Sequence, residues 1–208
     1  MDFVRISFKS YYDLSNDLFY VFHNDYSGKI DKNYLIEDSY FISFQKVDSS
    51  NDFLSYEKER ISAYSEENEI NTTELHVNPW GDLCLAPKNT SFYKKNSINK
   101  NLFIERLLIP FLYSHSFLEK NGVRPWKDYG HNEIGYFEAY KREKIPSSKE
   151  KAENTLFQLK ESLPSLEILT DQNYIENLRK KSEEAYAGLQ DFLDDLNKFS
   201  INISSNNE

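Results

Sequence analysis

The chain contains a single cysteine, Cys84, which follows a sequence typical of a tight turn. In residues 78–81 (Asn-Pro-Trp-Gly), asparagine suits the first position of a type I turn, proline fixes φ at the second and glycine suits the fourth. We therefore expect the backbone to reverse just before Cys84. If the next residues are extended, Leu83 and Leu85 face the core and the thiol faces the opposite side. A thiol at the mouth of a rigid turn is placed for nucleophilic attack.

Two polar residues before the turn are candidates to assist this thiol. The reversal brings His76 and Asn78 back beside Cys84, where they can donate hydrogen bonds to an oxyanion that develops at a carbonyl carbon. A second interpretation stays open, because free cysteines are often buried as small apolar residues and Leu-Cys-Leu is also typical of a core. A nucleophile needs exposure and a stabilised thiolate.

The same residues resemble the motifs of ubiquitin-conjugating enzymes, and especially of their bacterial relatives. That family carries a His-Pro-Asn tripeptide followed by Gly-x-[Ile/Leu]-Cys-Leu, whose cysteine accepts ubiquitin as a thioester. Residues 81–85 (Gly-Asp-Leu-Cys-Leu) match the second motif position for position, and residues 76–78 keep the His and Asn of the first. The spacer is shorter, and the proline follows the asparagine at Pro79. Residues 124–138 are similar to a Trp/Gly/His-rich segment of the bacterial proteins, so the resemblance covers residues 35–140.

The resemblance implies a role for each matched residue. Cys84 is the expected acceptor thiol, Asn78 helps to stabilise the oxyanion, and His76 holds the shape of the loop. Asp82, two residues before the cysteine, orients or deprotonates an incoming lysine. Thioester exchange requires an accessible thiolate and hydrogen-bond donors, so no cofactor or metal is expected.

The resemblance also implies partners. The expected enzyme receives the C-terminal glycine of a protein modifier from an activating enzyme or another thioester donor, and then transfers it to an amine. The similar bacterial proteins stand alone in anti-phage defence operons, notably those built on cyclic-oligonucleotide signalling (CBASS). There the modified species is the nucleotidyltransferase (CD-NTase) itself, and ubiquitin-like conjugation is the neighbouring possibility.

Two alternatives to a transferase remain open. In one, the same fold is a catalytically inactive binding or adaptor module whose cysteine is buried. In the other, the protein is a cysteine hydrolase in which Cys84 forms a dyad with His131 or His115. His131 lies in a polar segment and suits either a general base near Cys84 or a structural hydrogen bond, whereas His115 lies on a predicted helix and suits the core or its edge.

Composition excludes several other classes of function. The 208 residues include 25 Lys and Arg against 34 Asp and Glu, and the net charge of −9 repels nucleic-acid phosphates. One cysteine cannot form an internal disulfide. The chain has no apolar run long enough for a membrane helix, and its first residues do not resemble a signal peptide. We therefore expect a cytoplasmic protein that binds neither nucleic acid nor membrane.

The sequence around Cys84 predicts an α+β domain. Short apolar or β-branched runs separated by polar breaks predict an antiparallel β-meander before the cysteine, although the fourth run also suits a helix. The predicted strands lie at residues 3–8, 18–23, 40–47, 53–64 and 73–77. Residues 102–120 predict a flanking helix that Pro110 kinks or divides into two consecutive helices, and that Gly122 ends. Residues 123–140 suit an irregular loop with a short helix near Phe137. Trp80 and Trp126 are expected to pack, with Trp80 shielding the thiol.

The C-terminal quarter predicts an antiparallel helical hairpin. Residues 147–150 (Ser-Ser-Lys-Glu) form a capping box before the first helix, which Pro164 ends. A second helix is expected after Thr170, with an apolar seam over residues 175–199 that packs on the first helix or on a second copy as a homodimer. The expected organisation is a ubiquitin-conjugating-like domain over 1–146, a helical extension over 147–200 and a disordered tail over 201–208.

Overall fold

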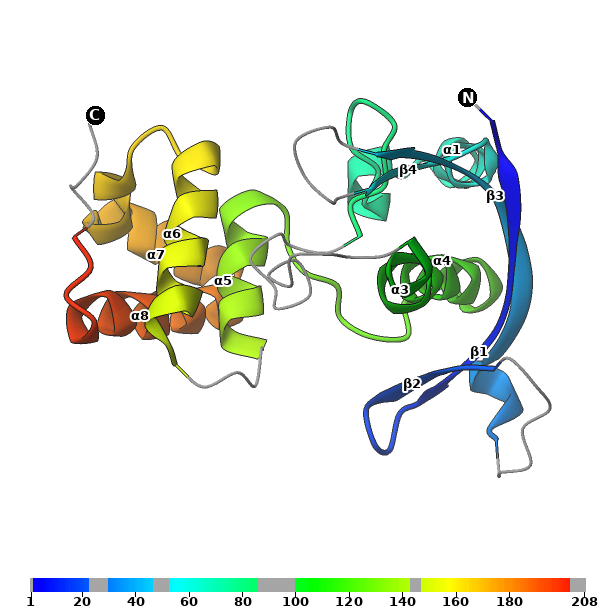
Figure 1. Ribbon diagram of the computed structural model, residues 1–208, viewed down its shortest axis with the longest axis horizontal. Helices are drawn as coiled ribbons and strands as arrows, with labels where there is room; N and C mark the ends of the chain where they lie inside the picture. The colour runs from blue at the N-terminus through cyan, green and yellow to red at the C-terminus, as the bar shows by residue number, and fades with distance from the viewer. Residues whose placement is uncertain (1, 23–29, 47–52, 86–99, 143–146, 203–208) are drawn as a thin grey trace. The chain divides into compact units, whose positions relative to one another are not determined.

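A computed structural model describes residues 2–22, 30–46, 53–85, 100–142 and 147–202 (Figure 1). The described residues form a mixed α/β structure in two compact units. The first unit contains the described residues up to 85 together with 100–128, and the second contains those from Tyr129 onward. The expected boundary lay after residue 146. It falls earlier because the helix after Tyr129 packs on the C-terminal helices.

The first unit is built on a four-stranded antiparallel sheet with the strand order β2-β1-β3-β4. Its strands are β1 (Val4–Asp13), β2 (Leu18–Val21), β3 (Leu35–Lys46) and β4 (Phe53–Glu57). The prediction of a sequential meander was wrong in its strand order, because β1 pairs on both edges. Its last residues pair with β2, from Ser10 opposite Val21, while Val4 to Tyr11 pair with β3.

Figure 1 shows the sheet curving around a helix that follows the cysteine in sequence. This helix comprises α3 (Lys100–Phe103), a π-helical segment (Ile104–Leu108) and α4 (Ile109–Asn121). Pro110 stands in the first turn of α4, and the N–H of Ile109 bonds to the carbonyl of Ile104, five residues back. Gly122 ends α4 with φ of 71°. The predicted irregularity at Pro110 and the predicted terminator are both confirmed.

Two segments predicted as strands are helical. The second half of residues 53–64 forms α1 (Arg60–Glu67), where a Glu57 carboxylate oxygen accepts from the N–H of Ile61 at 3.0 Å. Most of residues 73–77 forms a 3-10 turn (Thr72–Leu75), because the Asn71 side chain caps it by accepting from the N–H of Thr73.

The second unit is helical and contains α5 before the expected hairpin, whose second helix is divided in two. Its elements are α5 (Asn132–Arg142), α6 (Lys149–Ser162), a 3-10 turn (Leu166–Thr170), α7 (Gln172–Lys181) and α8 (Glu183–Lys198). The single helix predicted after Thr170 is broken at Ser182, whose hydroxyl caps α8 by accepting from the N–H of Ala185. Ser148 caps α6 in the same way, one residue later than the predicted capping box.

The predicted seam is buried inside this unit. Leu189 and Phe192 of α8 are fully buried beside Phe137 of α5. Gly188 permits the close approach of the two helices, because a Cβ there would lie 1.9 Å from the Phe137 carbonyl oxygen. The chain itself therefore covers the face that the sequence also offered to a second copy. Of the predicted tail, residues 203–208 lie outside the described residues.

Candidate active site

The predicted turn before Cys84 is confirmed, and it closes a short hairpin. The N–H of Gly81 donates to the carbonyl of Asn78 at 2.8 Å, and the N–H of Asn78 donates to the carbonyl of Asp82 at 2.8 Å. Gly81 has φ of +86°, in the left-handed region that favours glycine. Trp80 stands at the tip with 88% of its surface exposed, so the prediction that it packs was wrong.

Backbone pairing joins this hairpin to the edge of the sheet beside β4. The N–H of Leu83 donates to the carbonyl of Ser55 at 2.8 Å, and the N–H of Cys84 donates to the carbonyl of His76 at 2.7 Å. Val77 and Leu83 pair across the hairpin and are both buried. Cys84 is half-buried, and so is Leu85, which was expected to face the core. The outward direction of the thiol stays a prediction.

His76 connects this thiol to a carboxylate. Its ring is hydrogen-bonded to Cys84, and its Nε2 lies 3.4 Å from Oδ2 of Asp128. Burial of the ring opposes protonation, but hydrogen bonds and charge interactions with Asp128 and Cys84 outweigh burial and raise the pKa of His76 to about 9. At neutral pH a cationic imidazole therefore lies against the sulfur. The resemblance assigned His76 only to holding the loop, whereas the geometry makes it the thiol's direct partner.

Asp128 was not among the residues singled out from the sequence. It reaches His76 because α4 ends at Gly122 and the following segment returns along the first unit. Trp126 fixes this segment with its ring stacked on Tyr113 at 5.6 Å between centroids and edge-on to Tyr12 at 5.0 Å. The one available signal was that Asp128 lies in the Trp- and Gly-rich stretch that resembled the bacterial proteins.

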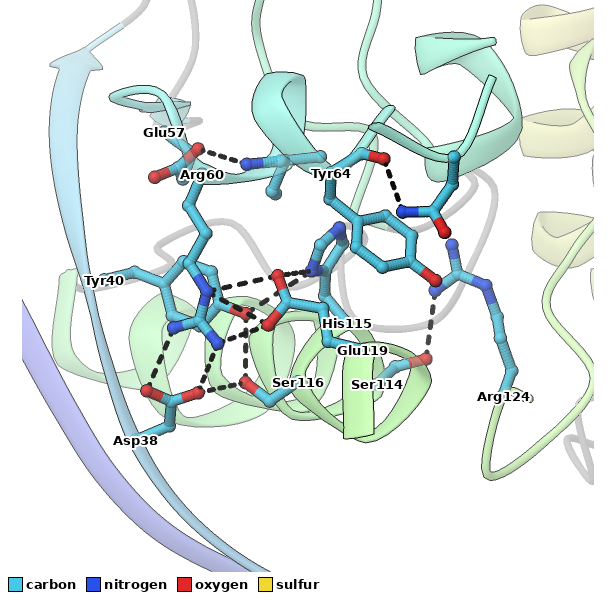
Figure 2. A network of polar contacts seen from close by, with 12 residues as sticks. Asp38, Tyr40, Glu57, Arg60, Tyr64, Ser114, His115, Ser116, Glu119 and Arg124 are labelled. Atoms are coloured by element: carbon cyan, nitrogen blue, oxygen red, sulfur yellow. Dashed lines mark hydrogen bonds and ion pairs between the residues drawn. The ribbon is translucent and has the colours of Figure 1, made fainter. Parts of the chain in front are cut away.

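Arg124 provides a second cation for Asp128. Its Nε donates to Oδ2 of Asp128 at 2.7 Å, and its Nη1 donates to the hydroxyl of Ser114 on α4 at 3.1 Å. Figure 2 shows the Arg124 guanidinium directed at Ser114. The carboxylate that holds His76 is thereby tied to the main helix of the unit.

Asn78 and Asp82 are hydrogen-bonded to each other. The amide nitrogen of Asn78 donates to Oδ2 of Asp82 at 2.8 Å, across the hairpin. Asp82 is buried. In this structure the pair stabilises the turn, so the oxyanion role of Asn78 and the amine-orienting role of Asp82 stay predictions.

The other two candidate histidines differ from His76 in their surroundings. His131 is exposed in the second unit, directly before α5. His115 is fully buried on α4, where its Nδ1 lies 3.3 Å from Glu119 and 3.4 Å from the hydroxyl of Tyr40. The histidine in contact with Cys84 is therefore neither of the two considered for a dyad.

His115 belongs to a polar cluster centred on Arg60 (Figure 2). The guanidinium binds Asp38 of β3 through two hydrogen bonds of 2.9 and 2.8 Å, binds Glu119 of α4 through its Nε and Nη2, and lies 4.3 Å from the centre of the Tyr40 ring. One arginine thus joins α1, β3 and α4.

The cluster keeps its two carboxylates ionised. Burial opposes ionisation of Asp38, but hydrogen bonds from Arg60 and Ser116 outweigh it and lower the pKa of Asp38. Burial also opposes ionisation of Glu119, where hydrogen bonds from His115 and Arg60 lower the pKa. Each charged group has an opposite charge beside it, so the cluster is suited to stabilising the packing of α4 on the sheet.

No set of three or more His, Cys, Asp and Glu side chains among the described residues is arranged to hold a metal ion. None of the helices in the described part of the chain has the length and apolar character needed to cross a bilayer. Comparisons of the chain with protein families, curated proteins and solved structures found no match in any of the three.

Proposed function

We propose that this protein is a cysteine-dependent acyl transferase that carries its acyl group as a thioester on Cys84. The observation that supports this proposal is the contact of Cys84 with His76, whose ring is in turn paired with Asp128. A cation that is hydrogen-bonded to sulfur favours the thiolate, which is the nucleophilic form. A carboxylate behind the imidazole fixes its orientation and stabilises its positive charge.

The first step is an exchange of thioesters. The Cys84 thiolate attacks the donor's carbonyl carbon, a new carbon–sulfur bond forms, and the donor's carbon–sulfur bond breaks. The leaving thiolate takes the electron pair and then a proton, which the His76 imidazolium is positioned to supply. The product is an acyl group on Cys84 and a free donor thiol.

The second step transfers the acyl group to an amine. The amine nitrogen attacks the carbonyl carbon, the bond to Cys84 breaks with its electrons on sulfur, and the amine's proton passes to His76 or to water. An amide and the Cys84 thiolate remain. The cycle consumes the energy of the donor thioester and requires no oxidant, metal or organic cofactor.

The resemblance to ubiquitin-conjugating enzymes supports a protein modifier with a C-terminal glycine as the acyl group. Three observations agree with this finer proposal: the match over residues 81–85, the antiparallel sheet before the cysteine, and the helix after it. On this basis we expect an activating enzyme or another thioester donor as the first partner. A nucleotidyltransferase (CD-NTase) or a ubiquitin-like protein is the expected modifier, in bacterial anti-phage defence.

Hydrolysis is the second candidate, because a Cys-His-Asp arrangement also activates cysteine hydrolases. The two functions share the acyl-enzyme and differ in the group that attacks it. Water releases a free acid, whereas an amine gives an amide.

The test uses a peptide thioester that ends in Gly-Gly as donor. Intact-mass spectrometry should detect an adduct on the wild-type protein that hydroxylamine or a thiol removes. A Cys84→Ser variant should form an adduct that thiols do not remove, or none, and a Cys84→Ala variant should form none. Added lysine should convert the adduct to a peptidyl-lysine amide. Release of free acid at the same rate with and without amine would favour the hydrolase, and a wild-type protein that neither forms an adduct nor releases free acid would contradict both functions.

A further inference from the structure

The most exposed large apolar side chain near the thiol is Trp80, at the tip of the hairpin that carries Cys84. We propose that Trp80 is a specificity-determining residue that binds an apolar side chain of the acyl donor's extended peptide tail, within the five residues that end at its C-terminal carbonyl. This inference rests on the proposed function and adds to it the kind of donor that the site prefers.

Exposure of this indole is not a consequence of a loose loop. The turn that carries Trp80 is closed by the two backbone hydrogen bonds between Asn78 and residues 81 and 82, and by the side-chain bond from Asn78 to Asp82. Because its backbone is fixed, Trp80 has only its side-chain rotations to lose when a partner covers it, and tryptophan is enriched among the residues that dominate binding energy.

The residue next to Trp80 is an exposed glycine. Gly81 has no side chain, and a ring carbon of Tyr56 lies 4.0 Å from where a Cβ of residue 81 would stand. An extended backbone can approach closely at a glycine, and the aromatic rings of Trp80 and Tyr56 offer apolar contact.

Covalent geometry sets how far the tail must reach. Trp80 and Cys84 are four residues apart, so their Cα atoms cannot be more than about 14 Å apart. An extended tail whose carbonyl carbon lies at the Cys84 sulfur covers the same distance with about four residues. The indole is therefore within reach of the tail's last five residues, while its final residues lie beside Cys84.

The experiment compares two five-residue peptide thioesters ending in Gly-Gly, one with leucine and one with serine at the fourth residue from the C-terminal end. The wild type should acylate Cys84 about tenfold faster with the leucine probe. A Trp80→Ala variant should lose this preference, and Trp80→Phe should keep most of it. Phe41→Ala, which removes another exposed aromatic ring of the same unit, should leave the preference unchanged.

The alkylation rate of Cys84 with iodoacetamide should be the same in all four proteins. Iodoacetamide has no peptide tail, so it can react at the sulfur without contacting the Trp80 indole. A wild type that acylates equally with both probes, or a Trp80→Ala variant that keeps the preference, would overturn this inference and leave the proposed function intact. Failure of both probes to acylate the wild type would overturn the proposed function, and this inference with it.

Discussion

The carboxylate of Asp128 lies 3.4 Å from Nε2 of His76, although the whole of α4 separates these residues in sequence. The thiol and the imidazole of the candidate site come from one hairpin, and the carboxylate comes from the segment beyond the helix. The reactivity of Cys84 is therefore expected to depend on a residue that has no local relation to it.

Replacing Asp128 with asparagine should make Cys84 less reactive. Asp128→Asn preserves the shape of the side chain but removes its charge, so the pKa of His76 should fall and less imidazolium should face the sulfur at neutral pH. We expect iodoacetamide to alkylate Cys84 about three- to tenfold more slowly at pH 7. Asp191→Asn, which removes a carboxylate paired with Lys141 in the second unit, is the matched control. Equal rates in the wild type and Asp128→Asn would refute the role of this carboxylate.

His76 should also make the stability of the first unit depend on pH. Its folded pKa of about 9 lies above its ordinary value of 6.5, so its contribution is complete below pH 6.5 and is lost as pH rises through 9. We expect a loss of roughly 1–3 kcal/mol over this window. Urea unfolding followed by tryptophan fluorescence should report it, because Trp80 and Trp126 both belong to the first unit. His76→Gln should flatten this part of the profile, and a slope that persists in this variant would point to other groups.

Arg60 should contribute most to the free energy of unfolding when its carboxylate partners are charged. The pKa values of Asp38 and Glu119 are lowered, so the stability that they provide is present above their ordinary values of 3.8 and 4.5 and is lost as pH falls through the lowered ones. We expect Arg60→Gln to cost roughly 1–3 kcal/mol at pH 7 and clearly less at pH 3.

The control for this variant is Arg179→Gln, because Arg179 forms an exposed pair with Glu183. It should change the free energy of unfolding by less than about 0.5 kcal/mol at either pH. If Arg60→Gln cost as much at pH 3 as at pH 7, the loss would come from side-chain packing and not from charge.

A methyl group at position 188 should separate two helices of the second unit. The Cβ of Gly188→Ala would lie 1.9 Å from the carbonyl oxygen of Phe137, so α5 and α8 must move apart. We expect destabilisation by roughly 2–4 kcal/mol, measured by thermal unfolding with circular dichroism at a helical wavelength. Gln190→Ala, an exposed substitution two residues later, should be close to neutral. Wild-type stability in Gly188→Ala would contradict the close approach.

The features that sequence predicted correctly are those fixed by neighbouring residues. The turn at 78–81 follows from the order of asparagine, proline and glycine, and the end of α4 follows from Gly122. The burial of Leu83 agrees with its apolar character next to the turn. Each of these signals lies within a few residues of the feature that it predicts.

The features that sequence missed depend on contacts between distant segments. No local pattern states that β1 lies between β2 and β3, since either edge of a ten-residue strand can pair. Residues 73–77 have strand-like composition, but Asn71 caps a 3-10 turn over them. The contact of His76 with Asp128 could not be predicted without knowing that the segment after α4 returns to the hairpin.

The division of the site between a hairpin and a distant segment has a consequence for biosynthesis. A ribosome releases Cys84 and His76 well before Asp128, so the growing chain carries a thiol whose imidazole still lacks its carboxylate. On the proposed function, the thiol gains its complete set of partners only once α4 has been made and the segment anchored by Trp126 has docked. Under the same proposal, we expect a nascent chain to be acylated more slowly than the finished first unit.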